Sequence, residues 1–505
     1  MARILLTLTA LLTAIVTATG CGNEGTAASG ATALAPAGSV MYGEATLKPD
    51  GDQQAAVEAL VEKFPGEGGA AERIRRLLQE GFAKSDSKLS YSKDIEPWLG
   101  DEAAFFVSRL DPKGDADGAL LIAADDEEKA FAAIDKASKG RSAEYEGTEY
   151  LVEDGNAAGV VDGFVVAGTV PAFKAAVDVA GGARSMEDAE AFKRTLADAP
   201  KERLGYLYVN SPRLHQTLRR SQAGAAFGGL GEFFKEPLLV TMNATADGVR
   251  FETVVSASLA KSFPLMAEGA DLVGSLPGDS WLALAQPDLG NTLDQYLTAL
   301  GDQLGGRDAL EQQFRAFTGL DLQEDVLSWM GDWGIFVRGE SMSELGGALI
   351  IETSDEAASG RVIDAIAAYA RRAGGSNVRV VPLRVPGEGV TMLSPDVPAP
   401  VHLFQRDGKV VFAYGDAAAE DALDPYVKLA DTPELARAEQ ALGGDYNISA
   451  YLAVDPILAL VDSTGAGSSE DWAKAKPYLE PLDALVGGAR KDGDKLRSAF
   501  GITVD

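Results

Sequence analysis

Cysteine and histidine are nearly missing from this chain, which has one cysteine and two histidines among 505 residues. A single cysteine has no partner for an intramolecular disulfide, so hydrophobic burial must hold the fold together, as it can in a chain of this length. A Ser–His–acid triad or a histidine-ligated zinc site would need His215 or His402. His215 lies at the start of a predicted helix and His402 lies in an alternating strand, so we interpret both as surface or packing residues.

The motifs that mark common enzyme classes are also absent. The sequence has no Gly-x-Ser-x-Gly elbow, no Gly-Lys-Ser/Thr phosphate loop and no Rossmann glycine pattern after a strand. Two Ser-x-x-Lys matches, at Ser85 and Ser258, have no Lys-Thr-Gly partner of the kind found in penicillin-recognising enzymes. We therefore predict no catalytic residues and no cofactor.

One acidic loop raises the question of a metal site. Asp111, Asp115 and Asp117 lie close together in the sequence, and carboxylates at such spacing can collect Ca²⁺. An EF-hand loop would need a bidentate glutamate at its twelfth position, where Ile122 stands. We interpret the loop as a solvated turn and predict no metal, with calcium binding as the alternative.

Positive charge is scarce relative to negative charge. The chain has 45 basic and 76 acidic residues, which gives a formal net charge of -31. An acidic surface repels phosphate backbones and anionic lipid headgroups, so we predict neither nucleic-acid binding nor docking to a membrane through a basic patch. The hydrophobic fraction of 46% is ordinary for a globular protein, and the acidic surface is typical of solubility.

The N-terminus predicts export. Arg3 precedes an apolar run from Ile4 to Val16, and small residues follow it. This pattern is typical of a signal peptide over residues 1–20, and the run is shorter than the roughly 20 residues that span a membrane. The sole cysteine, Cys21, comes next and resembles the cysteine of a bacterial lipobox, although Ala18 stands where leucine is favoured.

The lipobox resemblance implies that Cys21 carries a diacylglycerol and becomes the new N-terminus. Two acyl chains give stable anchoring, so we expect a protein held on the outer side of the cell membrane. Residues 21–38 contain the lipid-attachment cysteine and a small, polar stretch without periodicity. We predict that this stretch is a flexible tether.

One motif occurs twice in the body of the chain. Residues 94–107 read DIEPWLGDEAAFFV and residues 325–337 read DVLSWMGDWGIFV, with Asp-x-x-x-Trp-x-Gly-Asp in common. A repeated tryptophan beside a glycine turn is typical of a core anchor, and stacking on a ligand is the alternative. The positions that we single out as structural landmarks are Asp94, Trp98, Gly100, Asp101, Asp325, Trp329, Gly331 and Asp332.

Further landmarks follow in the same order in both halves. A strand beginning at Gly118 or Gly347 leads into a helix with Asp126 or Asp355 as the expected N-cap. In the second of these helices, an apolar stripe at i, i+4 and i+7 indicates a buried face. That stripe consists of Val362, Ile366 and Tyr369.

The repeated order predicts a tandem duplication. Hairpins with Asp162-Gly163 and Asp407-Gly408 turns favour antiparallel sheets with helices packed on one side, which is the α+β class. We place the first α+β repeat at residues 39–260, a linker at 261–275 and the second repeat at 276–505.

The two tryptophan motifs, the Gly-Ala-Leu-x-Ile strand, the lipoprotein-like start and the doubled layout resemble a bacterial family, the domain of unknown function 3352. The resemblance covers most of the chain that would remain after signal-peptide removal. It implies an envelope lipoprotein with no assigned activity, so no site residue is carried over from it.

These observations favour a non-catalytic, membrane-anchored envelope lipoprotein that binds or organises an envelope partner or a small ligand. The alternative is a hydrolase that uses carboxylates outside the cytoplasm, because acids are the one abundant catalytic residue type. Two acids that face each other in one pocket, with one of them desolvated, would favour the hydrolase. A smooth or apolar groove would favour a carrier or a partner site.

Overall fold

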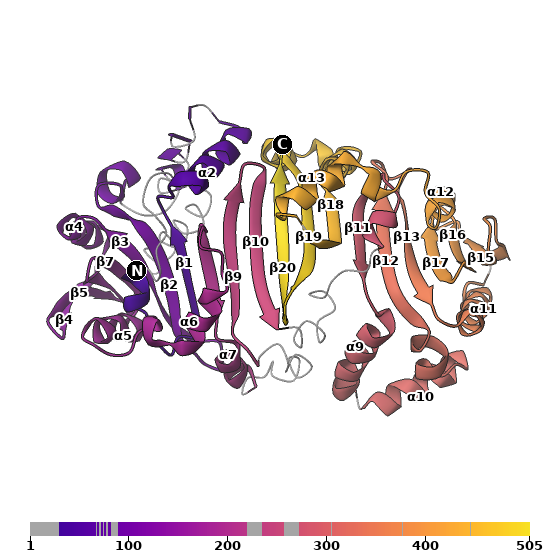
Figure 1. Ribbon diagram of the computed structural model, residues 1–505, viewed down its shortest axis with the longest axis horizontal. Coiled ribbons are helices and arrows are strands. Elements are labelled where there is room, and N and C mark those ends of the chain that lie inside the picture. Colours follow the sequence, from indigo (N-terminus) through magenta and orange to yellow (C-terminus); the bar gives the residue numbers. More distant parts are fainter. Residues whose placement is uncertain are drawn as a thin grey trace. The chain divides into compact units, whose positions relative to one another are not determined.

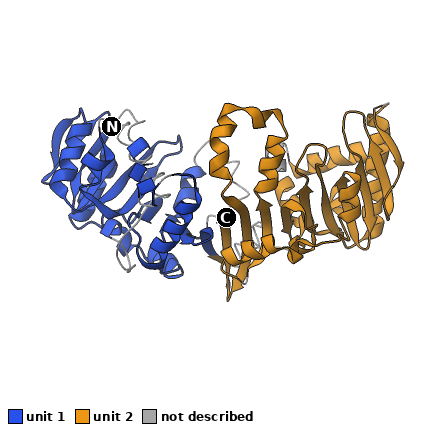
Figure 2. Cartoon of the chain, turned by 90° about the horizontal axis from the view of Figure 1, so that it is seen from above, with its two compact units in different colours: residues 1–254 blue, residues 255–505 orange. Residues whose placement is uncertain are grey.

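The computed structural model describes residues 30–505 except 67, 70–71, 74, 77–78, 82–88, 220–234, 257–271, 305, 376 and 445. The chain forms two compact units, unit 1 with residues 1–254 and unit 2 with residues 255–505 (Figure 2), and each is described by itself. The predicted signal peptide and Cys21 lie outside the described residues. In the described part of the chain, no helix is both long and apolar enough to cross a membrane.

Unit 1 is built on an antiparallel sheet. Its strands pair in the order β10-β9-β8-β1-β2-β3-β7-β6-β5-β4. The strands are β1 (Met41–Thr46), β2 (Leu99–Leu110), β3 (Ala116–Ala124), β4 (Arg141–Tyr145), β5 (Thr148–Glu153), β6 (Asn156–Val161), β7 (Phe164–Thr169), β8 (Gly205–Val209), β9 (Leu238–Thr245) and β10 (Gly248–Ser256).

Unit 2 is built on a second antiparallel sheet. Its strands pair in the order β20-β19-β18-β11-β12-β13-β17-β16-β15-β14. The strands are β11 (Ser280–Gln286), β12 (Met330–Arg338), β13 (Gly346–Thr353), β14 (Arg379–Pro382), β15 (Glu388–Leu393), β16 (Val401–Arg406), β17 (Lys409–Tyr414), β18 (Asn447–Ala453), β19 (Leu482–Asp492) and β20 (Lys495–Val504).

The two sheets have the same order of strands. The first strand of each unit, β1 or β11, lies inside the sheet. On one side it pairs with the strand of the tryptophan motif, β2 or β12, and on the other side it pairs with β8 or β18. The α+β class predicted from the sequence is confirmed, whereas the tandem duplication stays a prediction supported by this shared order.

Helices cover both faces of the sheet in unit 1, not one face as we expected. One face packs against α5 and α6 through Phe173 and Phe192. The other packs against α4 and the π-helix η2 through Ile134 and Ile95. The helices described in this unit are η1 (Gly30–Ala33), α2 (Gly51–Lys63), η2 (Tyr91–Ile95), α4 (Glu127–Ala137), α5 (Val170–Ala180), η3 (Met186–Asp188), α6 (Glu190–Ala197) and α7 (Ser211–Leu218).

The sheet of unit 2 is likewise covered on both faces (Figure 1). Alternation along β17 explains this, because Val411 faces one layer with α12 and α13 while Val410 faces the other with α11. The helices described here are η8 (Val273–Ser275), α9 (Leu289–Leu304), α10 (Arg307–Thr318), the π-helix η9 (Leu322–Leu327), α11 (Glu356–Ala373), α12 (Asp416–Asp421), η10 (Leu429–Asp431), α13 (Pro433–Ala441), α14 (Asp455–Asp462), η11 (Gly465–Ser468) and α15 (Glu470–Leu479).

Two predicted boundaries are wrong because apolar residues inside them belong to cores. The sequence predicts a tether through residue 38, but Ala31, Leu34 and Ala35 are buried in the core of unit 1. It predicts a linker at 261–275, but Leu272 and Val273 are buried in the core of unit 2. Residues 261–271 of that linker lie outside the described residues.

Local turn and cap predictions are confirmed. Asp162 and Asp407 have φ of 43° and 53°, and the glycines after them have φ of 78° and 71°, as a type I′ hairpin requires. The Asp126 side chain accepts a hydrogen bond from Lys129 N, and the Asp355 side chain accepts from the backbone in the first turn of α11. These acids begin the helices that follow β3 and β13.

Candidate functional site

The tryptophan motif builds the same local structure in both units. In each unit a π-helix, η2 or η9, ends just before a tryptophan that is only 2% exposed. Trp98 Nε1 donates to the carbonyl oxygen of Asp94 at 2.6 Å, and Trp329 Nε1 donates to that of Asp325 at 2.9 Å. Both indoles therefore lie in a core with their N–H satisfied.

The first aspartate of the motif, Asp94 or Asp325, links the π-helix to a later helix of its unit, α4 or α11. The Asp94 carboxylate accepts from Ser90 N at 2.7 Å and pairs with Lys136 of α4 at 2.6 Å. The hydrogen bond from Lys136 lowers the pKa of Asp94. In unit 2, the Asp325 carboxylate accepts from the backbone N of residue 321 at 2.9 Å and pairs with Arg361 of α11 at 2.9 Å.

The remaining landmarks have structural contacts too. A Cβ on Gly100 would lie 2.9 Å from the backbone carbonyl of Ala123, and one on Gly331 would lie 3.3 Å from a backbone oxygen. The Asp101 carbonyl accepts from the backbone N of residue 47 at 2.6 Å, and Asp332 Oδ1 accepts from the backbone N of residue 288 at 3.1 Å. The motif thus stabilises a strand start in each unit.

A pocket opens beside Trp329 in unit 2. It has a volume of about 300 Å³ and lies among α10, η9, α11 and β17. Most of its lining is aliphatic or aromatic, and it contains no aspartate or glutamate. Its lining includes Phe317, Trp329, Ile366, Tyr369, Arg372 and Phe412.

Two large aromatic side chains stand exposed at this pocket. Phe317 of α10 is 66% exposed and Tyr369 of α11 is 47% exposed. Their ring centroids are 5.3 Å apart, which is a favourable aromatic contact. Exposed aromatics that rim an apolar pocket are typical of a binding site.

The stripe of Val362, Ile366 and Tyr369 lines this pocket rather than a closed core. Val362 and Ile366 are half-buried, and Tyr369 is exposed. The prediction that this face is buried is therefore wrong at its C-terminal end. The apolar spacing identified the face but could not reveal that the neighbouring helices leave space beside it.

The helix α11 explains why the pocket has this form in unit 2. When Asp126 is aligned with Asp355, α4 ends seven residues before the position at which α11 ends. Those two extra turns contain Tyr369 and Arg372. A second difference is in the hairpin, where Phe412 stands four residues after the turn glycine and Ala167 occupies the matching place in unit 1.

A shallow groove continues from the pocket over the sheet of unit 2. Phe412 lines both the pocket and this groove, which has a volume of about 390 Å³. Its other walls come from β12, β13, β16 and β17 and include Ile335, Val337 and Leu349. These side chains are half-buried, so the sheet keeps an apolar face partly open to solvent.

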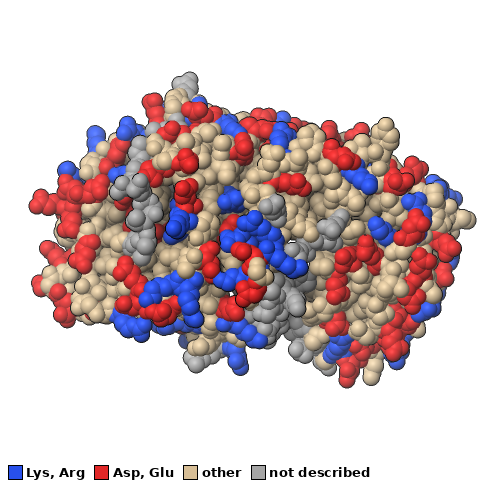
Figure 3. Space-filling view, in the orientation of Figure 1, with Lys and Arg blue, Asp and Glu red and all other residues tan. Residues whose placement is uncertain are grey.

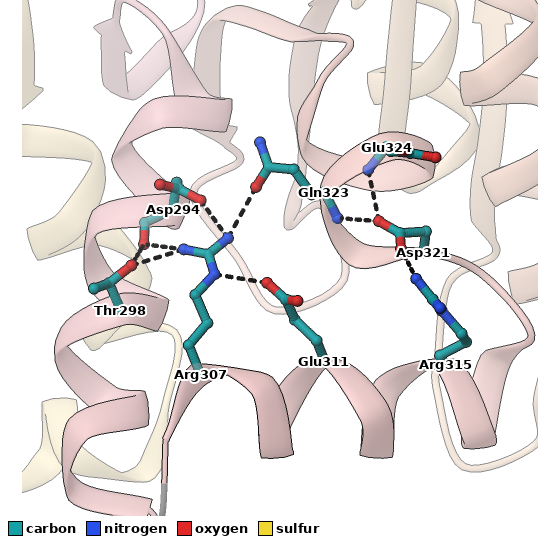
Figure 4. Close-up of polar contacts among 8 residues, drawn as sticks. All are labelled: Asp294, Thr298, Arg307, Glu311, Arg315, Asp321, Gln323 and Glu324. Atoms are coloured by element: carbon teal, nitrogen blue, oxygen red, sulfur yellow. Dashed lines mark hydrogen bonds and ion pairs between the residues drawn. The ribbon is translucent and has the colours of Figure 1, made fainter.

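A polar cluster holds the pair α9–α10 against η9, as Figure 4 shows. Arg307 at the start of α10 bonds Asp294 at 2.5 Å and Thr298 at 2.7 Å in α9. The same guanidinium bonds Glu311 at 2.6 Å and Gln323 of η9 at 2.8 Å. One side chain therefore connects three helical segments around the pocket.

A second arginine repeats this connection at the other end of α10. Arg315 pairs with the Asp321 carboxylate. Asp321 also caps η9, because its Oδ1 accepts from Gln323 N at 2.9 Å and Glu324 N at 2.8 Å. The wall formed by α10 is thus fixed through η9 at both of its ends (Figure 4).

None of His215, His402 and Asp483 lines the pocket. His402 is fully buried, with Nδ1 3.1 Å from Thr391 Oγ1 and Nε2 3.0 Å from Asp416 Oδ1. Burial raises the pKa of Asp483, which lies 3.8 Å from Arg437. His215 lies in α7 of unit 1.

The acidic loop of unit 1 is a local turn. Asp111 Oδ1 accepts from the backbone N of residues 113 and 115, and Asp117 pairs with Arg109 at 2.6 Å. Among the residues that the structure describes, no group of three or more His, Cys, Asp or Glu side chains is arranged to hold a metal ion.

Of the predicted landmarks, Trp329 alone lines the pocket. The helical pair α9–α10 and its arginines were not singled out from the sequence. The arginine–acid spacing of Arg307 and Glu311, at i and i+4, was the available signal for part of that cluster.

Solved structures resemble the chain only weakly. The structure titled "Structure of crystal form IV of TP0453" is 10% identical, with a TM-score of 0.25, and the match covers 45% of this chain and 79% of that chain. Crystal form I of TP0453 is 10% identical, with a TM-score of 0.24, and its match covers 45% of this chain and 77% of that one.

A comparison with curated proteins found no match. A family model does match the sequence, over residues 1–392, and its description is "Protein of unknown function (DUF3352)". The match covers well over half of the chain. The chain therefore belongs to the DUF3352 family.

Proposed function

We propose that this protein is a non-catalytic, exported envelope lipoprotein, anchored by a diacylglycerol on Cys21, and that its unit 2 binds a small apolar ligand. The observation that carries the binding role is the pocket of about 300 Å³ among α10, η9, α11 and β17. The signal-peptide pattern and the position of the sole cysteine support export and anchoring.

The pocket suits an apolar ligand in size and in lining. Small-molecule sites have volumes of roughly 300–1,000 Å³, so this pocket lies at the small end of that range. Its volume equals about ten volumes of liquid water, at about 30 Å³ each, or about ten methylene groups. Burial of ten methylene groups contributes roughly 8 kcal/mol before the costs of ordering, so we expect a micromolar or weaker dissociation constant.

The lining argues against the hydrolase alternative at this site. A carboxylate-dependent hydrolase needs two facing acids, and no acid lines the pocket. The polar lining residues are Thr318, Ser359 and Arg372. Ser359 Oγ donates to Gln405 Oε1 at 2.7 Å and so is engaged in the structure of the floor.

Binding is tested with a neutral fluorescent probe, N-phenyl-1-naphthylamine, on the full chain after signal-peptide removal with Cys21→Ala. We expect saturable fluorescence enhancement. Ala365→Phe fills the pocket from α11 and should weaken the probe at least tenfold, because Ala365 lines the pocket. Ala373→Phe adds the same ring to an exposed position on the last turn of that helix and serves as the control.

If the probe fails to saturate, or if both phenylalanine variants bind it as the parent does, the pocket is not the binding site. Circular dichroism and thermal unfolding of both variants check that the fold is retained.

Anchoring is tested separately in cells. We expect a metabolically incorporated alkyne fatty acid to label the parent and not Cys21→Ala, and we expect the parent to fractionate with membranes. In-cell crosslinking of the same two proteins would identify an envelope partner that is captured only by the anchored form. Equal fatty-acid labelling of both proteins would contradict the assignment of Cys21.

A further inference from the structure

The polar side chains of the pocket differ in whether they have hydrogen-bond or ion-pair partners. Thr318 Oγ1 donates to the carbonyl of Phe314 at 2.7 Å and accepts from Leu320 N at 3.1 Å. Ser359 is fully buried and bonded to Gln405. Arg372 is exposed and has no hydrogen-bond or ion-pair partner in the part of the chain that the structure describes.

An unpaired arginine at this place is informative because the protein is so acidic. The net charge is -31, and Figure 3 shows acidic side chains over much of the visible face. Such a surface disfavours anions unless a local cation receives them. A guanidinium presents a planar fork of N–H donors that matches a carboxylate or a phosphate.

A comparison with the neighbouring Arg371 separates a role in binding an anion from a role in stabilising the helix. Both arginines lie in the last turn of α11, where positive charge favours the helix macrodipole. Only Arg372 of the two lines the pocket. The macrodipole therefore accounts for both arginines, while the position at the pocket distinguishes one of them.

The apolar surface is elongated. The pocket holds about ten methylene groups by volume. Through Phe412 it continues into the shallow groove on the sheet. A flexible linear chain can follow such a path more readily than a rigid ring system of the same volume.

We infer that the ligand of unit 2 is a single-chain amphiphile with an anionic head, whose chain lies in the pocket and whose head pairs with Arg372. This inference rests on the proposed binding function and specifies its ligand class.

The test compares ligands that share one chain and differ in the head. Dodecanoate, dodecyl phosphate and dodecanol, all below their micelle concentrations, compete with the neutral probe on the full chain carrying Cys21→Ala. We expect at least one anion to displace the probe at about two- to fivefold lower concentration than the alcohol, because an exposed ion pair contributes up to about 1 kcal/mol. Raising the salt concentration should reduce this preference.

Two matched variants locate the charge. Arg372→Gln should remove the preference for the anion, because it lowers the affinity for the anion more than the affinity for dodecanol. Arg371→Gln should leave the affinities for both ligands unchanged. Both residues are exposed, so neither change should impair folding.

Equal displacement by the anions and the alcohol in the parent would overturn the inference, as would an equal effect of the two variants. The proposed function itself survives either result if the neutral probe still binds and Ala365→Phe still weakens it. Loss of that pocket-dependent probe binding would instead refute the binding function.

Discussion

Arg307→Gln should loosen the wall of the pocket without unfolding unit 2. The Arg307 side chain is 25% exposed, and it pairs with Asp294 and Glu311, which are each about one-third exposed. A fully exposed ion pair contributes up to about 1 kcal/mol and a charged hydrogen bond in a protected place about 1.5–3 kcal/mol. Loss of two partly exposed pairs should therefore reduce the free energy that holds α10 against η9 by about 2 kcal/mol.

A loss of about 2 kcal/mol corresponds to a roughly thirtyfold increase in local opening. Hydrogen exchange followed by mass spectrometry measures this, with peptides from residues 307–318 compared with peptides from 356–373. We expect faster exchange in the first segment and little change in the second. Arg371→Gln is the control, because it removes the same charge outside the cluster.

Two results would refute this reasoning. Unchanged exchange over residues 307–318 would mean that the Arg307 contacts do not hold α10. Equal acceleration over α10 and α11 would mean that the substitution destabilises unit 2 as a whole.

Three further predictions concern stability. Burial lowers the pKa of His402 below 6.5. The stability that the neutral imidazole contributes is therefore complete above pH 6.5 and is lost as the pH falls. His402→Gln should reduce the pH dependence of the melting temperature between pH 7 and 5. Trp329→Phe leaves the Asp325 carbonyl without its donor and should cost about 2–4 kcal/mol in urea unfolding, and no loss would contradict the anchor role. Asp94→Asn should lower the urea midpoint at pH 7, because it removes the ion pair with Lys136. The midpoints of parent and variant should converge below the lowered pKa of Asp94, where protonation breaks that pair in the parent. A difference between the two midpoints that stays constant with pH would contradict this.

Residue chemistry that acts locally was readable from the sequence. Asp162-Gly163 and Asp407-Gly408 predicted hairpins because few residues tolerate positive φ, and the N-cap acids of α4 and α11 predicted helix starts. The order of these signals in two halves also matched the shared order of strands. Such signals depend on a few neighbouring residues, so a single sequence contains them.

Features that depend on how segments meet were not readable. Residues 30–35 are mostly small and read as part of a linker, yet Ala31 and Ala35 are fully buried because a small side chain suits a tight contact as well as a loop. The stripe on α11 indicated an apolar face, but its exposure depends on where α10 places Phe314 and Phe317. A pocket is space left between elements, and no residue pattern specifies space directly.

The burial of Ala31, Leu34 and Ala35 also limits how far the proposed anchor can reach. Ten residue steps separate Cys21 from Ala31, and even a fully extended chain covers at most about 3.3–3.6 Å per residue. A lipid on Cys21 would therefore hold the first core contact of unit 1 within about 35 Å of the bilayer. A tether running to residue 38 would have allowed about twice that distance, so unit 1 would work close to the membrane surface rather than at a distance from it.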